Sequence, residues 1–174
     1  YGNLIVIHLL TLTLLGFSIQ ACAQENNWTQ FRGTNQNALA EKDNIPLNWN
    51  ESVIKWKTGI HDEGHSSPVV YGDQIWLTTA TPEGNKLFAV CVDYRTGKII
   101  HDINIFNPPA VERKHPLNSY ATPTPVIEKG FVYVHYGSMG TACINTSDGS
   151  VVWKRDDFKC KHVQGPASSP VIYK

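Results

Sequence analysis

Short runs of apolar residues, each ended by residues that favour turns, follow one another from residue 68 onward. In the first group the runs cover residues 68–71, 74–79, 87–92 and 98–103. Between them stand Gly72-Asp73, Glu83-Gly84-Asn85 and Thr96-Gly97. These residues supply the positive-φ or side-chain-capped positions that tight hairpins require. The pattern predicts four short antiparallel strands.

The same pattern occurs a second time. Its runs cover residues 126–127, 131–136, 141–144 and 150–154, and the segment from Cys91 to His101 aligns with that from Cys143 to Trp153, 52 residues later. Both groups open on a Ser/Thr-Pro-Val triplet, and a third triplet begins at Ser169. Four short strands in a repeat of this length are typical of a β-propeller blade. We predict an all-β propeller of four-stranded antiparallel blades, present as a closing strand, two blades and the start of a third.

A polar signature predicts how the third and fourth strands of each repeat are joined. Asp93 stands four residues before Gly97, and Asn145 stands four residues before Gly149. This spacing is suited to a tight hairpin in which the acid or amide caps the turn and glycine takes a positive φ. We interpret these four residues as structural.

Tryptophan positions predict the packing between blades. Trp153 ends a fourth strand and offers a large flat face to a neighbouring blade, whereas His101 takes that position in the first copy and predicts a weaker contact. Trp56 stands before the first repeat much as Trp153 stands before the third. Residues 53–60 are therefore predicted to form an outermost strand that completes the last blade of a closed ring and removes an exposed edge.

These residues carry a family resemblance. The series of a buried Cys, an apolar residue, Asp or Asn, three residues, Gly, a short run and Trp resembles the blade motif of the pyrroloquinoline-quinone-type (PQQ-like) β-propeller repeat. The opening Trp28-Thr29-Gln30-Phe31-Arg32-Gly33 is similar to the start of bacterial members of this group. The resemblance covers residues 28–174 and implies the propeller fold. The group includes quinoprotein dehydrogenases and also the non-enzymatic propeller lipoprotein of the outer-membrane barrel-assembly machinery.

The first residues predict export. Residues 4–19 are mostly apolar and uncharged, which is typical of a signal-peptide core. Ile19-Gln20-Ala21-Cys22 resembles a bacterial lipobox in which Cys22 would be lipidated. Ala21-Cys22-Ala23 equally fits the small-x-small cleavage rule, which would give a soluble protein starting at Gln24. We predict a signal over residues 1–22 and a periplasmic or outer-membrane-anchored product.

The remaining chain divides into two parts. Residues 23–45 are predicted to be a polar arm lying on the propeller, and residues 46–174 an incomplete propeller. Because a ring closes with about 4 to 8 blades, we expect the chain to be the N-terminal part of a longer protein. With 15 basic against 15 acidic residues it has no polyelectrolyte character, so no nucleic-acid partner is predicted.

Candidate binding residues lie in the links between blades, residues 60–67, 106–124 and 158–169. Each link returns from an outermost to an innermost strand and brings its residues to one mouth of the channel, and binding residues concentrate on loops held by rigid scaffolds. The candidates are His65, Ser66, His115, Asn118, Tyr120, His162 and Gln164. The three histidines stand at different distances from the following proline, so no metal cage is predicted.

Two function classes remain open. The first is a non-catalytic scaffold that binds an envelope protein or a small ligand, with no cofactor in this region. The second, implied by the resemblance, is a PQQ-dependent alcohol or sugar dehydrogenase that holds PQQ and Ca²⁺ over the channel beside a disulfide of adjacent cysteines. No two cysteines are adjacent here, and Cys91 and Cys143 are predicted to be unbonded interior residues of different blades. We expect the scaffold.

Overall fold

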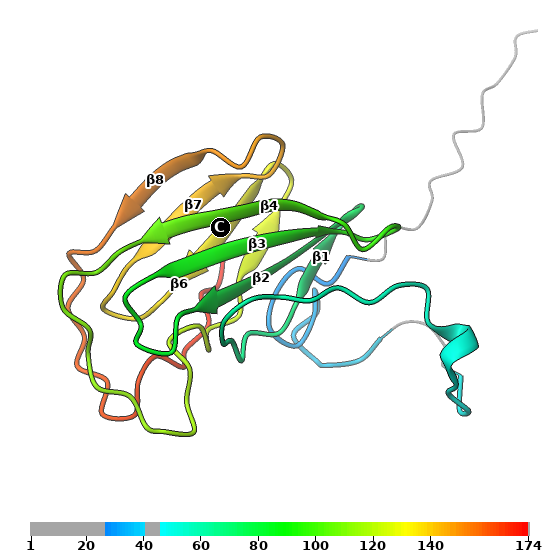
Figure 1. The fold of residues 1–174 in the computed structure, drawn as a ribbon. Coiled ribbons are helices and arrows are strands. Elements are labelled where there is room, and N and C mark those ends of the chain that lie inside the picture. Colours follow the sequence, from blue (N-terminus) through cyan, green and yellow to red (C-terminus); the bar gives the residue numbers. More distant parts are fainter. Residues whose placement is uncertain (1–26, 41–45, 174) are drawn as a thin grey trace, which may run out of the picture.

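A computed structural model describes residues 27–40 and 46–173. Within these ranges the chain is all-β, and its only helical element is the 3₁₀ turn η1 (Glu51–Val53). Eight strands form two four-stranded antiparallel sheets, with the orders β1-β2-β3-β4 and β5-β6-β7-β8. Figure 1 shows the two sheets lying against each other, with the long links between strands at one end.

The strands agree closely with those that the apolar pattern predicts. The first sheet contains β1 (Val69–Tyr71), β2 (Gln74–Ala80), β3 (Leu87–Asp93) and β4 (Ile99–Phe106). The second contains β5 (Val126–Glu128), β6 (Phe131–His135), β7 (Thr141–Asn145) and β8 (Val151–Arg155). The prediction of two consecutive four-stranded antiparallel units is confirmed.

The turn between the third and fourth strands has the same construction in both sheets. Asp93 Oδ1 accepts a 2.7 Å hydrogen bond from the Thr96 N–H, and the Gly97 N–H donates to the Asp93 carbonyl at 2.9 Å. Asn145 and Gly149 form the equivalent 2.9 Å backbone bond. Gly97 and Gly149 both have φ of +73°, a conformation that glycine adopts without strain. The predicted hairpins are confirmed.

The two sheets also share a register and a bulge. A β-bulge follows the cysteine of β3 and of β7 at the same place. One cross-strand row pairs Trp76 with Cys91 and His101, and the equivalent row pairs Tyr133 with Cys143 and Trp153. The Trp76 and His101 rings stack at 5.6 Å, and the Tyr133 and Trp153 rings lie 6.2 Å apart. His101 is smaller than Trp153, but its partner Trp76 is larger than Tyr133, so the two rows contain similar aromatic volumes.

One hydrophobic core joins the two sheets. It includes Leu87 and Ala89 of β3 and Val132 and Val134 of β6. Tyr136 ties the sheets together, since its hydroxyl donates to the Phe88 carbonyl at 2.7 Å and its ring meets Phe106 edge-on at 6.0 Å.

The segment before the first sheet corrects one prediction. Residues 53–60 were expected to form an outermost strand, but η1 covers the start of this segment, and residues 54–60 join no strand among the described residues. Side chains hold the segment instead: Trp56 Nε1 donates to the Tyr94 carbonyl at 3.0 Å, and Thr58 Oγ1 donates to the Gly97 carbonyl. The Trp56 indole covers Gly97 so closely that a Cβ there would lie 2.5 Å from the ring.

Contacts between successive units repeat along the chain. The His101 ring covers Gly149 as Trp56 covers Gly97. The Ser67 N–H donates to Thr124 Oγ1 at 3.0 Å, and the Thr124 N–H donates to Ser169 Oγ at 3.0 Å. Ser169 therefore accepts from Thr124 as Thr124 accepts from Ser67, and residues 170–173 form no strand.

The described part of the arm lies on the edges of both sheets. Trp28 and Val70 exchange two backbone hydrogen bonds of 2.8 Å, and the Ile127 N–H donates to the Thr29 carbonyl at 2.9 Å. The arm thus covers the outward edges of β1 and β5, which would otherwise present unpaired backbone groups.

Candidate functional site

Three links meet at one end of the sheets. The N–H groups of His65 and Ser66 both donate to the Ala121 carbonyl at 3.1 Å, which joins the first link to the second. The His115 N–H donates to the Gln164 carbonyl at 3.2 Å, which joins the second link to the third. Figure 1 shows the second and third links side by side at the lower left. Segments far apart in the sequence therefore form one continuous surface.

Asn118 fastens two of these links together. Its Nδ2 donates to the carbonyls of Gln164 at 2.7 Å and Pro166 at 3.2 Å, and its Oδ1 accepts from Thr122 Oγ1 at 2.5 Å. A shallow cavity of about 490 Å³ lies beside it, lined also by His115 and Gln164. Three of the predicted binding residues thus come together, with Asn118 occupied by backbone contacts.

Two other candidates point into the structure. Tyr120 belongs to the core, and its hydroxyl donates to the Glu112 carbonyl at 2.9 Å. Ser66 Oγ accepts from the Thr78 N–H at 3.1 Å. Both side chains hold the links on the sheets and present little polar surface to a ligand.

His162 lies beside another histidine. Its Nε2 is buried and has no hydrogen-bond partner among the described residues. His135 Nδ1 and Thr141 Oγ1 are 2.7 Å apart. Burial of His135, together with the nearby charge of His162, lowers the pKa of His135 below its ordinary value. Among the described residues, the two histidines do not join His65 or His115 in a group that could hold a metal ion.

A cluster of one histidine and two aspartates lies at the start of the first link, and the sequence did not predict that these three residues meet. His61 lies between two carboxylates, with Nδ1 2.7 Å from Asp62 Oδ2 and Nε2 3.0 Å from Asp102 Oδ1. Partial burial acts to lower the pKa of His61, but the hydrogen bonds and charges of Asp102 and Asp62 outweigh it and raise that pKa. Asp102 comes from β4, so only the pairing of β4 with the first link reveals the cluster.

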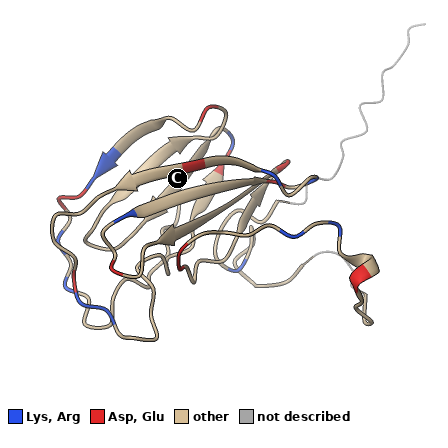
Figure 2. Ribbon diagram, in the orientation of Figure 1, with Lys and Arg blue, Asp and Glu red and all other residues tan. Residues whose placement is uncertain are grey.

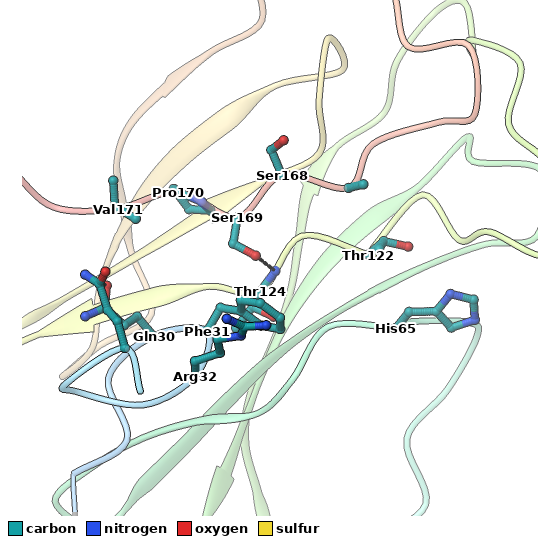
Figure 3. Close-up of a pocket in the computed structure, with 12 residues that line it drawn as sticks. Gln30, Phe31, Arg32, His65, Thr122, Thr124, Ser168, Ser169, Pro170 and Val171 are labelled. Atoms are coloured by element: carbon teal, nitrogen blue, oxygen red, sulfur yellow. Dashed lines mark hydrogen bonds between the residues drawn. The ribbon is translucent and has the colours of Figure 1, made fainter. Parts of the chain in front are cut away.

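A larger cavity lies between the arm and the starts of the repeats. It has a volume of about 590 Å³ and is lined by Phe31, Arg32, Gln36, Thr124, Ser168 and Ser169, among others. His65, a predicted binding residue, also lines it. Figure 3 shows the arm residues on one side and Ser168 to Val171 on the other, with the Ser169–Thr124 hydrogen bond between them. The sequence pointed to the arm motif but not to this role for it.

Metal-ligating and thiol side chains are dispersed among the described residues. Among residues 27–40 and 46–173, no three His, Cys, Asp or Glu side chains lie close enough together to hold a metal ion. Cys91, Cys143 and Cys160 are free, and burial, with the charge of Asp93, raises the pKa of Cys91 to about 12. Figure 2 shows several Lys and Arg residues on the second and third links.

The predicted lipidation site Cys22 and the rest of the signal region, residues 1–22, lie outside the described residues. Within the described ranges, the structure has no helix of the length and apolar character needed to cross a bilayer. No protein-family model matches this chain, and no curated protein matches it significantly.

Proposed function

We propose that this chain is part of an exported β-propeller that acts as a non-catalytic binding scaffold in the bacterial cell envelope. The propeller is supported by the repeated contacts between units. In one such contact, the Trp56 ring covers Gly97 and the His101 ring covers Gly149. In another, a backbone N–H donates to the hydroxyl that opens the next repeat, from Ser67 to Thr124 and from Thr124 to Ser169. A chain that repeats one packing step produces a ring or an array of sheets.

The binding role rests on one observation, the joining of three polar links at one end of the sheets. Hydrogen bonds between the links support a surface that is fixed before a partner arrives, and a preorganised surface loses less entropy on binding. The second and third links carry Arg113, Lys114, Lys159 and Lys161. These charges favour a partner with an acidic surface.

The quinoprotein alternative requires groups that could hold PQQ and Ca²⁺. The chain has two pairs of adjacent acids, Asp62-Glu63 and Asp156-Asp157. Asp62 pairs with His61, and Asp157 accepts a 2.9 Å hydrogen bond from Arg155 Nε. Neither Cys91 nor Cys143 forms a disulfide. The described residues therefore do not fit this pair of cofactors, and we derive no reaction step through them.

Site-specific photocrosslinking in cells tests the binding role. A photoreactive amino acid replaces the exposed His115 in the complete natural protein, and the control replaces the exposed Tyr94 on the opposite β3–β4 turn. We expect an adduct with an envelope component from position 115 only. Adducts from neither position, or reduction of an artificial electron acceptor by the protein with PQQ, Ca²⁺ and an alcohol or sugar, would overturn the proposal.

Export and anchoring have a separate test. Protein expressed in bacteria with an intact start is expected to incorporate radiolabelled palmitate and to fractionate with the outer membrane, and Cys22→Ala should abolish the label. An unlabelled soluble product beginning at Gln24 would contradict the lipid anchor while leaving export intact.

A further inference from the structure

The cavity between the arm and the repeat starts has the size and the edges of a small-molecule site. Its volume of about 590 Å³ falls in the ordinary range of ligand pockets. One wall is the arm, and the other walls are the second link and the start of the third repeat. Backbone pairing of Trp28 with Val70 holds the arm in place, so the cavity is bounded by residues attached to both sheets.

The charge of the cavity favours an anion. Arg32 lines it, and no Asp or Glu does. Arg95 and Arg155 each pair with a carboxylate, but Arg32 forms no ion pair among the described residues and lies 5.7 Å from the Phe31 ring. A guanidinium without a carboxylate partner can take a ligand carboxylate through two parallel hydrogen bonds.

The backbone of the arm is held in an unfavourable shape at this wall. Arg32 and Gln36 have φ of 63° and 56°, in the left-handed region that side chains other than glycine seldom adopt. The Ala38 N–H donates to the Arg32 carbonyl at 2.9 Å, and the Gln36 N–H donates to the Gly33 carbonyl at 3.0 Å, so a hydrogen-bonded loop maintains this shape. Backbone strain of this kind concentrates at ligand sites, and both side chains line the cavity.

The uncharged lining groups favour a hydroxylated ligand. Thr124 Oγ1 and Ser169 Oγ each accept a hydrogen bond from a backbone N–H, which leaves their own hydrogens to donate. Gln30 and Gln36 add two amides. Gln30 Nε2 donates to the Thr34 carbonyl at 3.2 Å and Gln36 Nε2 donates to Gln30 Oε1 at 3.5 Å, which leaves the Gln36 oxygen and one N–H of each amide for a ligand. Phe31, half-exposed, adds an apolar face. This combination of one cation, several hydroxyls and amides and one ring matches a ligand with one carboxylate, several hydroxyls and C–H surface.

We propose that this cavity binds a sugar acid, with its carboxylate on Arg32 and its hydroxyls on the Gln, Ser and Thr side chains. The inference goes beyond the proposed function, in which the partner binds at the three links, and assigns a second binding site to the cavity beside the arm. Inorganic phosphate is less well matched, because it has no apolar face and, near neutral pH, carries more negative charge than one guanidinium neutralises.

Calorimetric titration of the complete natural protein with glucuronate tests the proposal. We expect saturable binding at least tenfold tighter than that of glucose, which lacks the carboxylate, and of acetate or phosphate, which lack the sugar ring. Glucose binding as tightly as glucuronate, acetate or phosphate binding as tightly, or no binding of glucuronate would each overturn the proposal.

The variant Arg32→Gly separates binding from folding. Glycine is at ease at φ of 63°, so we expect unchanged or higher thermal stability together with at least a tenfold loss of glucuronate affinity. Arg95→Gln removes one positive charge from the β3–β4 turn and should retain affinity within twofold. Glucuronate binding by Arg32→Gly at the natural affinity would overturn the assignment. Failure of this inference leaves the scaffold proposal standing if the photocrosslink forms, whereas PQQ-dependent turnover removes the scaffold proposal whatever glucuronate does.

Discussion

At the residue scale, Gly97 joins the first sheet to the segment before it. Its carbonyl accepts a hydrogen bond from Thr58 Oγ1, and its missing side chain makes room for Trp56. Gly72 has a similar positive φ but no atom within 4 Å of the place a Cβ would take. Replacing each glycine by alanine therefore distinguishes the cost of backbone strain, which both positions share, from the cost of displaced packing, which only Gly97 has.

We predict that Gly97→Ala is more destabilising than Gly72→Ala. Each places alanine in the left-handed region at a cost of about 1–2 kcal/mol. Only Gly97→Ala also displaces the Trp56 indole, which adds about 1–3 kcal/mol to the loss of stability. Urea unfolding of both variants measures the difference. Equal losses would show that Trp56 does not pack on the turn.

Two histidines predict opposite dependences of stability on pH. The pKa of His135 is lowered from 6.5, chiefly by burial and then by His162, so the stability tied to its neutral form is present above pH 6.5 and is lost as the pH falls through the folded pKa. For His61, burial acts to lower the pKa, but Asp102 and Asp62 outweigh it and raise it above 6.5. Its stabilising contribution is present below pH 6.5 and is lost as the pH rises through the folded pKa.

Denaturant unfolding of the variants at several pH values between about 5 and 8 checks these signs. His135→Gln should reduce the loss of stability on the acidic side, and His61→Gln should reduce the loss on the alkaline side. The His61 effect should be small, because the imidazole is 35% exposed and water screens its ion pairs. If His61→Gln, and not His135→Gln, removed the loss of stability at acidic pH, the roles given to the two histidines would be contradicted.

At the scale of elements, the links depend on a few side chains that replace regular backbone pairing. Asn118 is the clearest, with donors to two carbonyls of the third link and acceptors for two groups of its own link. The sequence made Asn118 a binding candidate, because a polar residue in a long loop is equally suited to binding a ligand and to holding the loop in place. The structure assigns most of its hydrogen-bonding capacity to the protein itself.

We predict that Asn118→Ala lowers the free energy of unfolding by about 1–3 kcal/mol, since it removes the side-chain donor to the Pro166 carbonyl and one of the two donors to the Gln164 carbonyl. The neighbouring Leu117, whose side chain is 83% exposed, provides the control, and Leu117→Ala should change stability by less than about 0.5 kcal/mol. Hydrogen exchange should also become faster in both links of Asn118→Ala. Equal stabilities of the two variants would contradict the role of Asn118.

At the scale of the whole molecule, β8 is an exposed edge strand. Val151, Val152 and Trp153 are all exposed, whereas His101, which is equivalent to Trp153, covers the turn of the next sheet. Under the propeller proposal, the turn of a third repeat would cover Trp153 in the same way.

Trp153→Ala tests this proposal. Complete burial of the indole predicts a loss of about 3–5 kcal/mol. Trp153 is 42% exposed in this chain, so the loss here should be about 2 kcal/mol. We expect the larger value in the complete natural protein and the smaller one in a 174-residue chain. The same small loss in both would argue against a third repeat on β8.

The sequence predicted those features in which the interacting residues are close together along the chain. Turn chemistry at Asp93-Gly97 and Asn145-Gly149 acts over four residues, and the alternation of apolar positions acts over one strand, so both could be read directly. Residues 53–60 also alternate in a strand-like way, but a strand needs a partner backbone. Side chains of Trp56 and Thr58 hold the segment instead, a choice that depends on the distant turn at Gly97.

The sequence by itself thus determined the eight strands, their hairpins and the order in which each sheet pairs, because neighbours in the chain form all of these contacts. Only the tertiary structure decided that Tyr120 joins the core, that Asp102 meets His61, and that Arg32 and Ser169 line one cavity. Those residues lie tens to more than a hundred positions apart. Their meeting depends on how the two sheets and the arm pack, which no local pattern specifies.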